Sequence, residues 1–283
     1  LPLNDRVELP CSVSKPGDDG ESHNVTIMVE WRVAMMPLSH GIKLVLRCLT
    51  PLGEPLTLDN MDLLPAQREL LESKMQRRSG IVVLTGPMGS GKTSLVYALF
   101  DTVNRIARCC HTLEDPVEFV HRHKRSIVNQ REVGVDTRSW HNALKNTLRQ
   151  APDVILIGEI RDRETMEHAI SFAETGHLCI STLHANNANQ ALDRIINFFP
   201  DQKRRQLLLD LSLNLQAFVS QRLIPNQQGA RSAAIEILLG TPTVNELITR
   251  GDIGSIKEVM EKSEELGMKT FDKALFDLYE AGK

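Results

Sequence analysis

The sequence Gly86-Pro87-Met88-Gly89-Ser90-Gly91-Lys92-Thr93 fits the pattern G-x-x-x-x-G-K-[ST]. It follows an apolar run at residues 81–85 and precedes a helical run at residues 94–100. Glycines let backbone N–H groups turn toward a phosphate, the lysine ammonium can reach β- and γ-phosphates, and the threonine hydroxyl can ligate Mg²⁺. The stretch therefore predicts a nucleotide-phosphate site between a strand and a helix. We expect the nucleotide to be bound by Gly86, Gly89, Ser90, Gly91, Lys92, Thr93 and Ser94.

The composition limits the classes of protein that fit this chain. Its 283 residues, 41% of them hydrophobic, suffice for one large core or two unequal cores. A net charge of −3 gives no overall attraction to nucleic acid. The five cysteines include no C-x-x-C pair, which favours a reducing cytoplasmic setting. No stretch approaches the roughly 18–20 apolar residues that a membrane-spanning helix needs.

The N-terminal part has the composition of β-structure. Residues 25–33 and 42–49 read as strands, with a turn signal between them at residues 37–41. Residues 15–23 are polar and read as an exposed loop. These patterns predict an N-terminal β-rich domain over residues 1–50, followed by a linker over residues 51–64 that begins with a proline-marked stretch.

The remainder has a different pattern. Over residues 65–190, short apolar runs of strand length alternate with helical runs, which predicts an α/β core with parallel strands and crossover helices. Residues 191–283 are predicted to be mostly helical, with one strand at residues 232–239. Residues 201–222 are read as a single helical stretch with a broad leucine face.

Two acidic segments follow strand candidates of the core. Glu114, Asp115 and Glu118 lie within five residues, an arrangement that suits water activation or Mg²⁺ binding but is also found in solvated acidic turns. Glu159 ends the buried-type run 154–159 of the strand candidate at residues 154–160. It resembles the acid of a Walker B strand, which orients metal and water near a γ-phosphate. Because Gly158 occupies the position of the usual aspartate, Glu159 must perform that role alone.

A polar cluster follows the strand candidate at residues 178–183. Thr182 and His184 lie at its carboxyl end, where they could sense a γ-phosphate, and His177 precedes the strand. The neighbourhood has no cysteine or aspartate at metal-ligand spacing, so no zinc site is expected.

Four segments together resemble a known superfamily. G-P-M-G-S-G-K-T, T-L-E-D-P-V-E-F, L-R-Q-A-P-D-V-I-L-I-G-E-I-R-D-R-E-T and T-G-H-L-C-I-S-T-L-H-A-N are similar, in this order, to the Walker A, Asp box, Walker B and His box of the type II/IV secretion ATPases. Residues 189–200 and 266–279 resemble the pilus-retraction branch typified by PilT and PilU. Residues 29–47 are more similar to the N-terminal domain of GspE/PilB-type enzymes, and this domain is expected to be shorter than in either branch.

The resemblance implies a RecA-like P-loop ATPase domain with a small PAS-like N-terminal domain and a helical C-terminal region. It implies a homohexameric Mg-ATP-hydrolysing motor for type IV pilus retraction in twitching-type motility, cytoplasmic and peripheral at the inner membrane. The implied partners are an inner-membrane platform protein and a paralogous retraction ATPase. A pilus-assembly or type II secretion ATPase is the alternative, and a RecA-like nucleic-acid translocase is the alternative of another class.

The resemblance also implies roles for individual residues. Glu118 matches the general base, Glu159 the Walker B acid, and His184 the His-box residue near the γ-phosphate. Thr93 and Glu159 match the Mg²⁺ ligands, Glu159 acting directly or through water. Only the resemblance selects Glu118 over Glu114 as the base.

Two arginines of the N-terminal part resemble those that reach the nucleotide in the family. Arg32 and Arg47 lie on neighbouring strand candidates and could project from one β-surface. An arginine delivered by a separate domain can stabilise charge on a transferring phosphoryl group. Both are therefore expected to act in catalysis, although an exposed strand arginine is also ordinary.

Overall fold

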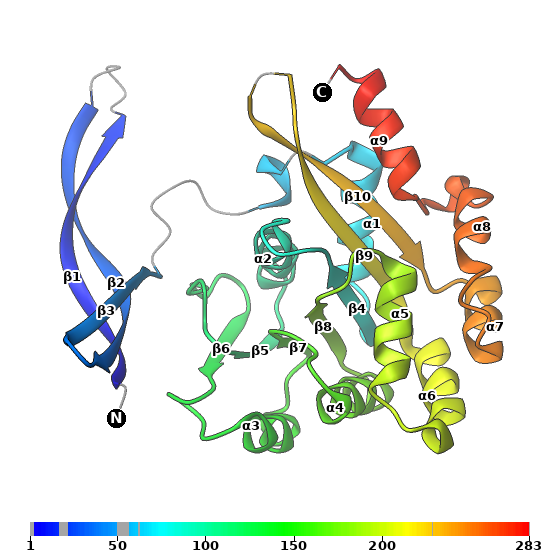
Figure 1. The fold of residues 1–283 in the computed structure, drawn as a ribbon, viewed down its shortest axis with the longest axis horizontal. Helices are drawn as coiled ribbons and strands as arrows, with labels where there is room; N and C mark the ends of the chain where they lie inside the picture. Colours follow the sequence, from blue (N-terminus) through cyan, green and yellow to red (C-terminus); the bar gives the residue numbers. More distant parts are fainter. Residues whose placement is uncertain (1–2, 17–21, 50–56, 62, 228, 283) are drawn as a thin grey trace.

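The computed structural model describes residues 3–16, 22–49, 57–61, 63–227 and 229–282. These residues form a three-stranded sheet near the N-terminus and a seven-stranded sheet accompanied by helices. Figure 1 shows the small sheet (blue) standing beside the larger α/β part. Of the linker expected over residues 51–64, residues 51–56 and 62 lie outside the described part of the chain.

The small sheet is antiparallel, with the order β1-β2-β3 for Leu3–Pro16, Ser22–Leu38 and Gly41–Cys48. The two predicted strands are confirmed, but β1 was not anticipated. The expectation of an exposed loop over residues 15–23 was wrong at its ends, because antiparallel pairing continues to Pro16 and Ser22. A polar sequence does not exclude this pairing, because the ladder joins backbone groups. Arg32 pairs directly with Arg47, so both side chains lie on one face of the sheet.

The large sheet has the order β10-β9-β4-β8-β7-β5-β6. All neighbours pair in parallel except β10 with β9. Strand β4 leads into the glycine-rich loop and is buried throughout. Because the carboxyl ends of parallel strands meet at one edge, the ends of β4, β5, β7 and β8 converge there. The bounds are β4 Gly80–Thr85, β5 Cys109–Glu114, β6 Ile127–Glu132, β7 Val154–Ile157, β8 Leu178–Leu183, β9 Leu215–Pro225 and β10 Arg231–Leu239.

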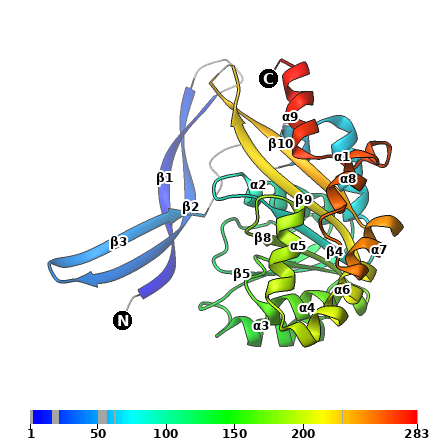
Figure 2. The same cartoon turned by 45° about the vertical axis from the view of Figure 1, so that its right-hand side comes forward.

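Helices cover both faces of this sheet, as expected for crossover connections. Figures 1 and 2 show α1 and α2 on one side of the central strands and α3 and α4 on the other. None of the described helices is both long and apolar enough to cross a membrane. Their bounds are α1 Pro65–Met75, α2 Lys92–Asn104, α3 Trp140–Thr147, α4 Arg163–Glu174, α5 Ala188–Asn197, α6 Asp201–Asn214, α7 Pro242–Arg250, α8 Ile256–Glu261 and α9 Phe271–Glu280, with 3₁₀ turns at Leu58–Asn60, Leu148–Gln150 and Glu264–Leu266.

Two parts of the large sheet differ from the predictions. The expected helical stretch 201–222 ends at Asn214, and its second half belongs to β9, which pairs with β4 and β10. Most of β9 is buried, and this packing overrides a leucine spacing that fits a helix. Leu213, which the leucine spacing placed on the apolar face, is 73% exposed. Strand β6 was not anticipated because its sequence IVNQRE is half polar, as an edge strand permits.

Candidate functional site

The glycine-rich loop connects β4 to α2 and begins the site. Gly91 precedes Lys92 with φ of +80°, a left-handed conformation in which a side chain is strained. A Cβ at Gly91 would also approach Gln221 Nε2 to 2.6 Å. The left-handed backbone therefore favours glycine at this position, and a side chain here would also have to displace the Gln221 amide. Helix α2 begins at Lys92, so its N-terminal N–H groups face the cavity beside the loop.

The Lys92 ammonium is folded over its own loop. Nζ donates to the carbonyl oxygens of Gly86 at 2.7 Å and Pro87 at 2.8 Å. Partial burial lowers the pKa of Lys92 from its ordinary value. Both carbonyls are neutral acceptors, so a phosphate oxygen brought to this position would be the stronger partner for the cation.

Gln221 of β9 contacts the glycine-rich loop, and the sequence pattern does not indicate this role. Its Nε2 donates to the Ser90 carbonyl at 2.8 Å, and the side chain is almost fully buried. No local signal could have identified it, because it lies in the stretch that was read as helical.

Glu114, at the end of β5, is buried, and both of its carboxylate oxygens accept hydrogen bonds. Its carboxylate accepts from Thr112 Oγ1 at 2.7 Å, Gln130 Nε2 at 3.1 Å and the Tyr97 hydroxyl at 2.8 Å. Burial is the largest influence on the Glu114 pKa and raises it, and the three donors oppose that shift. A carboxylate held in this way is poorly placed to accept a proton from water.

Glu118 is the exposed acid of the same segment. Its side chain is 41% exposed, and its Oε1 accepts from Arg47 Nη1 of β3 at 2.7 Å. Arg32, on the same face of the small sheet, instead pairs with the fully buried Glu132 at the end of β6, at 3.1 Å. The two arginines therefore connect the small sheet to the large one at two different carboxylates.

Glu159 follows β7 and lies between the side chains of His184 and Arg161. Its Oε2 lies 3.2 Å from His184 Nε2, and its Oε1 is paired with Arg161. Arg161 also reaches Asp115 Oδ2 at 3.2 Å. Burial, followed by the charges of Lys92, Arg194 and Arg161, lowers the pKa of His184.

The packing against the end of β5 explains why the residue before Glu159 is a glycine. A Cβ at Gly158 would lie 3.2 Å from the Leu113 carbonyl and 3.3 Å from Glu114 Cα. An aspartate at this position would crowd the end of β5. Gly158 is nevertheless anchored, since its carbonyl accepts from Thr182 Oγ1 at 2.7 Å.

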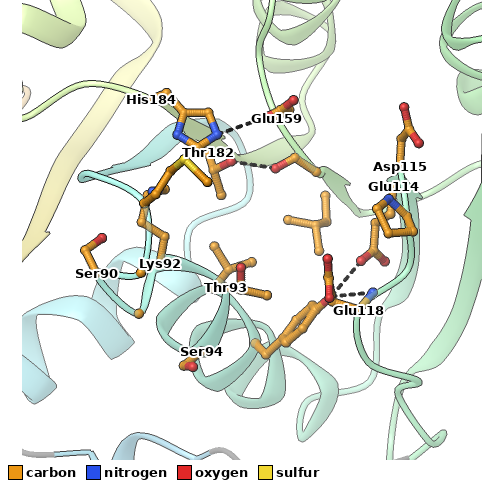
Figure 3. A pocket seen from close by; sticks show the side chains of 18 of the residues that line it. Ser90, Lys92, Thr93, Ser94, Glu114, Asp115, Glu118, Glu159, Thr182 and His184 are labelled. Carbon is orange, nitrogen blue, oxygen red and sulfur yellow. Dashed lines mark hydrogen bonds and ion pairs between the residues drawn. The ribbon is translucent and has the colours of Figure 1, made fainter. Parts of the chain in front are cut away.

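A cleft of about 660 Å³ brings most of the predicted residues together. Figure 3 shows Lys92, Thr93, Glu118, Glu159 and His184 around this cavity. Gly86 lines a neighbouring hollow, and His177 lies at the opposite end of β8 from His184. Arg32 contacts Glu132, and Arg47 reaches the cleft through Glu118. The predicted residues that line the cleft are Gly89, Ser90, Gly91, Lys92, Thr93, Ser94, Glu114, Asp115, Glu118, Glu159, Thr182 and His184.

The donors in the cleft suit a hard cation. Thr93 offers a hydroxyl, and Glu159 and Glu118 offer carboxylates, which are oxygen ligands of the kind that Mg²⁺ prefers. Within the described residues, no group of three or more His, Cys, Asp or Glu side chains could hold a metal by itself. A magnesium ion here would therefore share its coordination with phosphate oxygens and water, as this ion commonly does.

The fold and the cleft define a P-loop nucleotide-binding protein of the α/β class. Residues 14–269 match the family described as Type II/IV secretion system protein, and the chain belongs to this family. It is 52% identical over 217 residues to the type IV pilus ATPase PilU of Pseudomonas aeruginosa, covering 76% of this chain and 57% of PilU. It is 42% identical over 205 residues to the retraction ATPase PilT of the same organism, covering 72% of this chain and 59% of PilT.

The solved structures agree on the fold. A crystal structure of the pilus retraction motor PilT with bound ADP matches with a TM-score of 0.81 and 35% identity, covering 99% of this chain and 75% of that one. The predicted RecA-like α/β fold is confirmed. The chain spans a little under three fifths of the length of the PilU and PilT relatives given above.

Proposed function

We propose that this chain hydrolyses ATP with Mg²⁺ in the cleft beside the glycine-rich loop. Lys92 binds the β- and γ-phosphates, and Thr93 and Glu159 hold the ion together with phosphate oxygens and water. Glu118 accepts the proton of the attacking water. His184 contacts the γ-phosphate from the end of β8. A bound Mg²⁺ would neutralise charge that develops on the phosphates.

One observation carries this proposal: side chains from four separate strand ends line a single cleft. Lys92 follows β4, Glu118 follows β5, Glu159 follows β7 and His184 follows β8. Between the two acids of the Asp box, Glu118 is preferred as base because it is half exposed and held by one exposed arginine, whereas Glu114 is buried with three donors.

We further propose that the chain works as a homohexameric motor for type IV pilus retraction. The names of the PilU and PilT relatives and of the PilT crystal structure support the pilus and the retraction assignments. In this proposal the motor is cytoplasmic, docks on an inner-membrane platform protein and cooperates with a paralogous retraction ATPase.

The domain organisation is part of the same proposal. Residues 1–50 form the N-terminal domain, 51–64 the linker, 65–190 the ATPase core and 191–283 its C-terminal part. The ion pairs Arg32–Glu132 and Arg47–Glu118 support a docking role for the N-terminal domain, because both join the small sheet to the large one. The arginines are proposed to move with this domain toward the nucleotide.

The hydrolase proposal is tested by Lys92→Ala. Removing the side-chain cation that the loop aims at the phosphates should abolish ATP turnover and weaken nucleotide binding, measured by phosphate release and isothermal titration. Lys203→Ala is the matched control, since Lys203 is an exposed lysine paired with Glu167 on the helical side of the molecule. Wild-type turnover in the Lys92 variant would refute the site.

A separate experiment must decide whether the motor retracts or assembles pili. Deleting the gene should leave cells with accumulated pili that do not retract, whereas an assembly or secretion ATPase would leave cells without pili or secreted product. A nucleic-acid translocase would instead show ATP turnover stimulated by DNA or RNA, with salt-dependent affinity. Absence of any pilus phenotype together with stimulation by nucleic acid would overturn the motor proposal.

A further inference from the structure

The Tyr97 hydroxyl connects two segments of the candidate site. Tyr97 lies on α2, five residues beyond Lys92, and is 4% exposed. Its hydroxyl donates to Glu114 Oε2 at 2.8 Å and accepts from the backbone N–H of Glu118 at 3.3 Å. The helix that begins with the phosphate-binding lysine is thereby bonded directly to the backbone of the proposed base.

The directions of these two bonds are fixed. A backbone amide can only donate, so the hydroxyl must accept from Glu118. Its single proton is then free to point to Glu114, whose other oxygen is satisfied by Thr112 and Gln130. Burial and the nearby Glu114 charge raise the pKa of Tyr97, so the hydroxyl stays protonated and keeps both bonds. Glu114 thus orients the hydroxyl, and the hydroxyl holds the Glu118 amide.

The Tyr97 ring is also held in place. It packs against Phe119 with centroids 5.3 Å apart and edge-on against His121 at 5.0 Å. Phe100, the next α2 residue on this side, packs on the same His121 ring at 4.7 Å. The aromatic contacts hold the segment after Glu118 against α2. Among the described hydrogen bonds made by α2, the one from the Tyr97 hydroxyl reaches Glu118 itself.

We propose that Tyr97 is a positioning residue for Glu118, acting through its hydroxyl with Glu114 as the orienting acceptor. The proposal rests on the proposed ATP hydrolysis, in which Glu118 is the base. A base must be held within hydrogen-bond reach of the attacking water, and an anchored backbone limits the positions that its side chain can sample.

The test is Tyr97→Phe, which removes the hydroxyl and keeps the ring. We expect kcat for ATP to fall about ten-fold, the effect of losing one well-placed hydrogen bond, with KM and the affinity for ATP unchanged. Amide exchange at Glu118 should become faster in the same variant. Phe100→Leu is the matched control, because it loosens the same aromatic packing without touching Glu114 or Glu118 and should leave kcat near that of the parent.

A double-mutant cycle with Glu114→Gln tests the orienting role. The two changes disturb one hydrogen-bonded unit, so the double variant should lose little more than the worse single variant. If Tyr97→Phe fails to fold, Glu114→Gln alone provides the test and must lower kcat at unchanged KM. Parent kcat in Tyr97→Phe, or an equal loss in Phe100→Leu, overturns the inference.

Failure of this inference is distinguishable from failure of the proposed function. If the parent hydrolyses ATP, Lys92→Ala abolishes turnover and Tyr97→Phe changes nothing, only the role of Tyr97 is refuted. If the parent shows no ATP turnover at all, the proposed hydrolase itself fails, and the role of Tyr97 fails with it.

Discussion

Arg47 Nη1 of the small sheet lies 2.7 Å from Oε1 of Glu118, the exposed acid of the cleft. Both side chains are largely solvated, with 52% and 41% of their surface exposed. A pair of this kind contributes about 0–1 kcal/mol to stability, so exchanging it for a contact with phosphate costs little. The observed contact therefore suits a domain that can close and reopen over the cleft.

The first prediction concerns Arg47→Ala. The free energy of unfolding should change by less than about 1 kcal/mol, because the pair is exposed. ATP turnover should fall by at least about ten-fold with little change in ATP affinity, since the contact with phosphate would strengthen in the transition state. Denaturant unfolding and steady-state kinetics measure the two quantities. Parental turnover in the Arg47→Ala variant would show that Arg47 has no role in hydrolysis.

Arg32→Ala should behave differently. Arg32 pairs with Glu132, whose side chain is completely buried, and removing one member of a buried pair costs about 3 kcal/mol. We expect reduced stability in denaturant unfolding, and the double variant Arg32→Ala/Glu132→Gln should recover part of it by removing the buried charge. Lost turnover without lost stability would instead support the catalytic role that the family resemblance predicts for Arg32.

A pH dependence follows from His121. Burial is the main cause that lowers its pKa to about 4, compared with about 6.5 in an unfolded chain. The unfolded chain therefore binds the proton first, and stability is lost as pH falls from about 6.5 to about 4, by up to about 3 kcal/mol. His121→Leu should flatten the dependence of unfolding free energy on pH over this interval. An unchanged slope would contradict the assignment.

The convergence of the motifs could be predicted from sequence for a physical reason. Each of Lys92, Glu118, Glu159 and His184 follows an apolar run of strand length, and parallel strands bring such positions to one edge. The pattern of apolar residues was enough to locate these strands because they are buried and short. It failed at β9, where pairing with β4 and β10 decides the structure, and at the half-polar edge strand β6.

The sequence alone could not predict the contacts between distant segments. The face shared by Arg32 and Arg47 followed from strand alternation, but their different partners depend on where the small sheet lies. The bonds from Tyr97 to Glu114 and Glu118 depend on the rotation of α2 about its axis, and Tyr97 by itself reads as an ordinary core aromatic. The choice between Glu114 and Glu118 likewise rests on burial, which spacing cannot supply.

The central claim, hydrolysis of ATP with Glu118 as the base, is tested most directly by comparing Glu118→Gln with Glu114→Gln in one assay. ATP binding is measured by titration and phosphate release by steady-state kinetics, with Mg²⁺ present. We predict that Glu118→Gln binds ATP like the parent but loses about two orders of magnitude or more of turnover. Glu114→Gln should lose about ten-fold, the effect of one hydrogen bond. If Glu118→Gln keeps parental turnover while Glu114→Gln abolishes it, the assignment of the base is wrong.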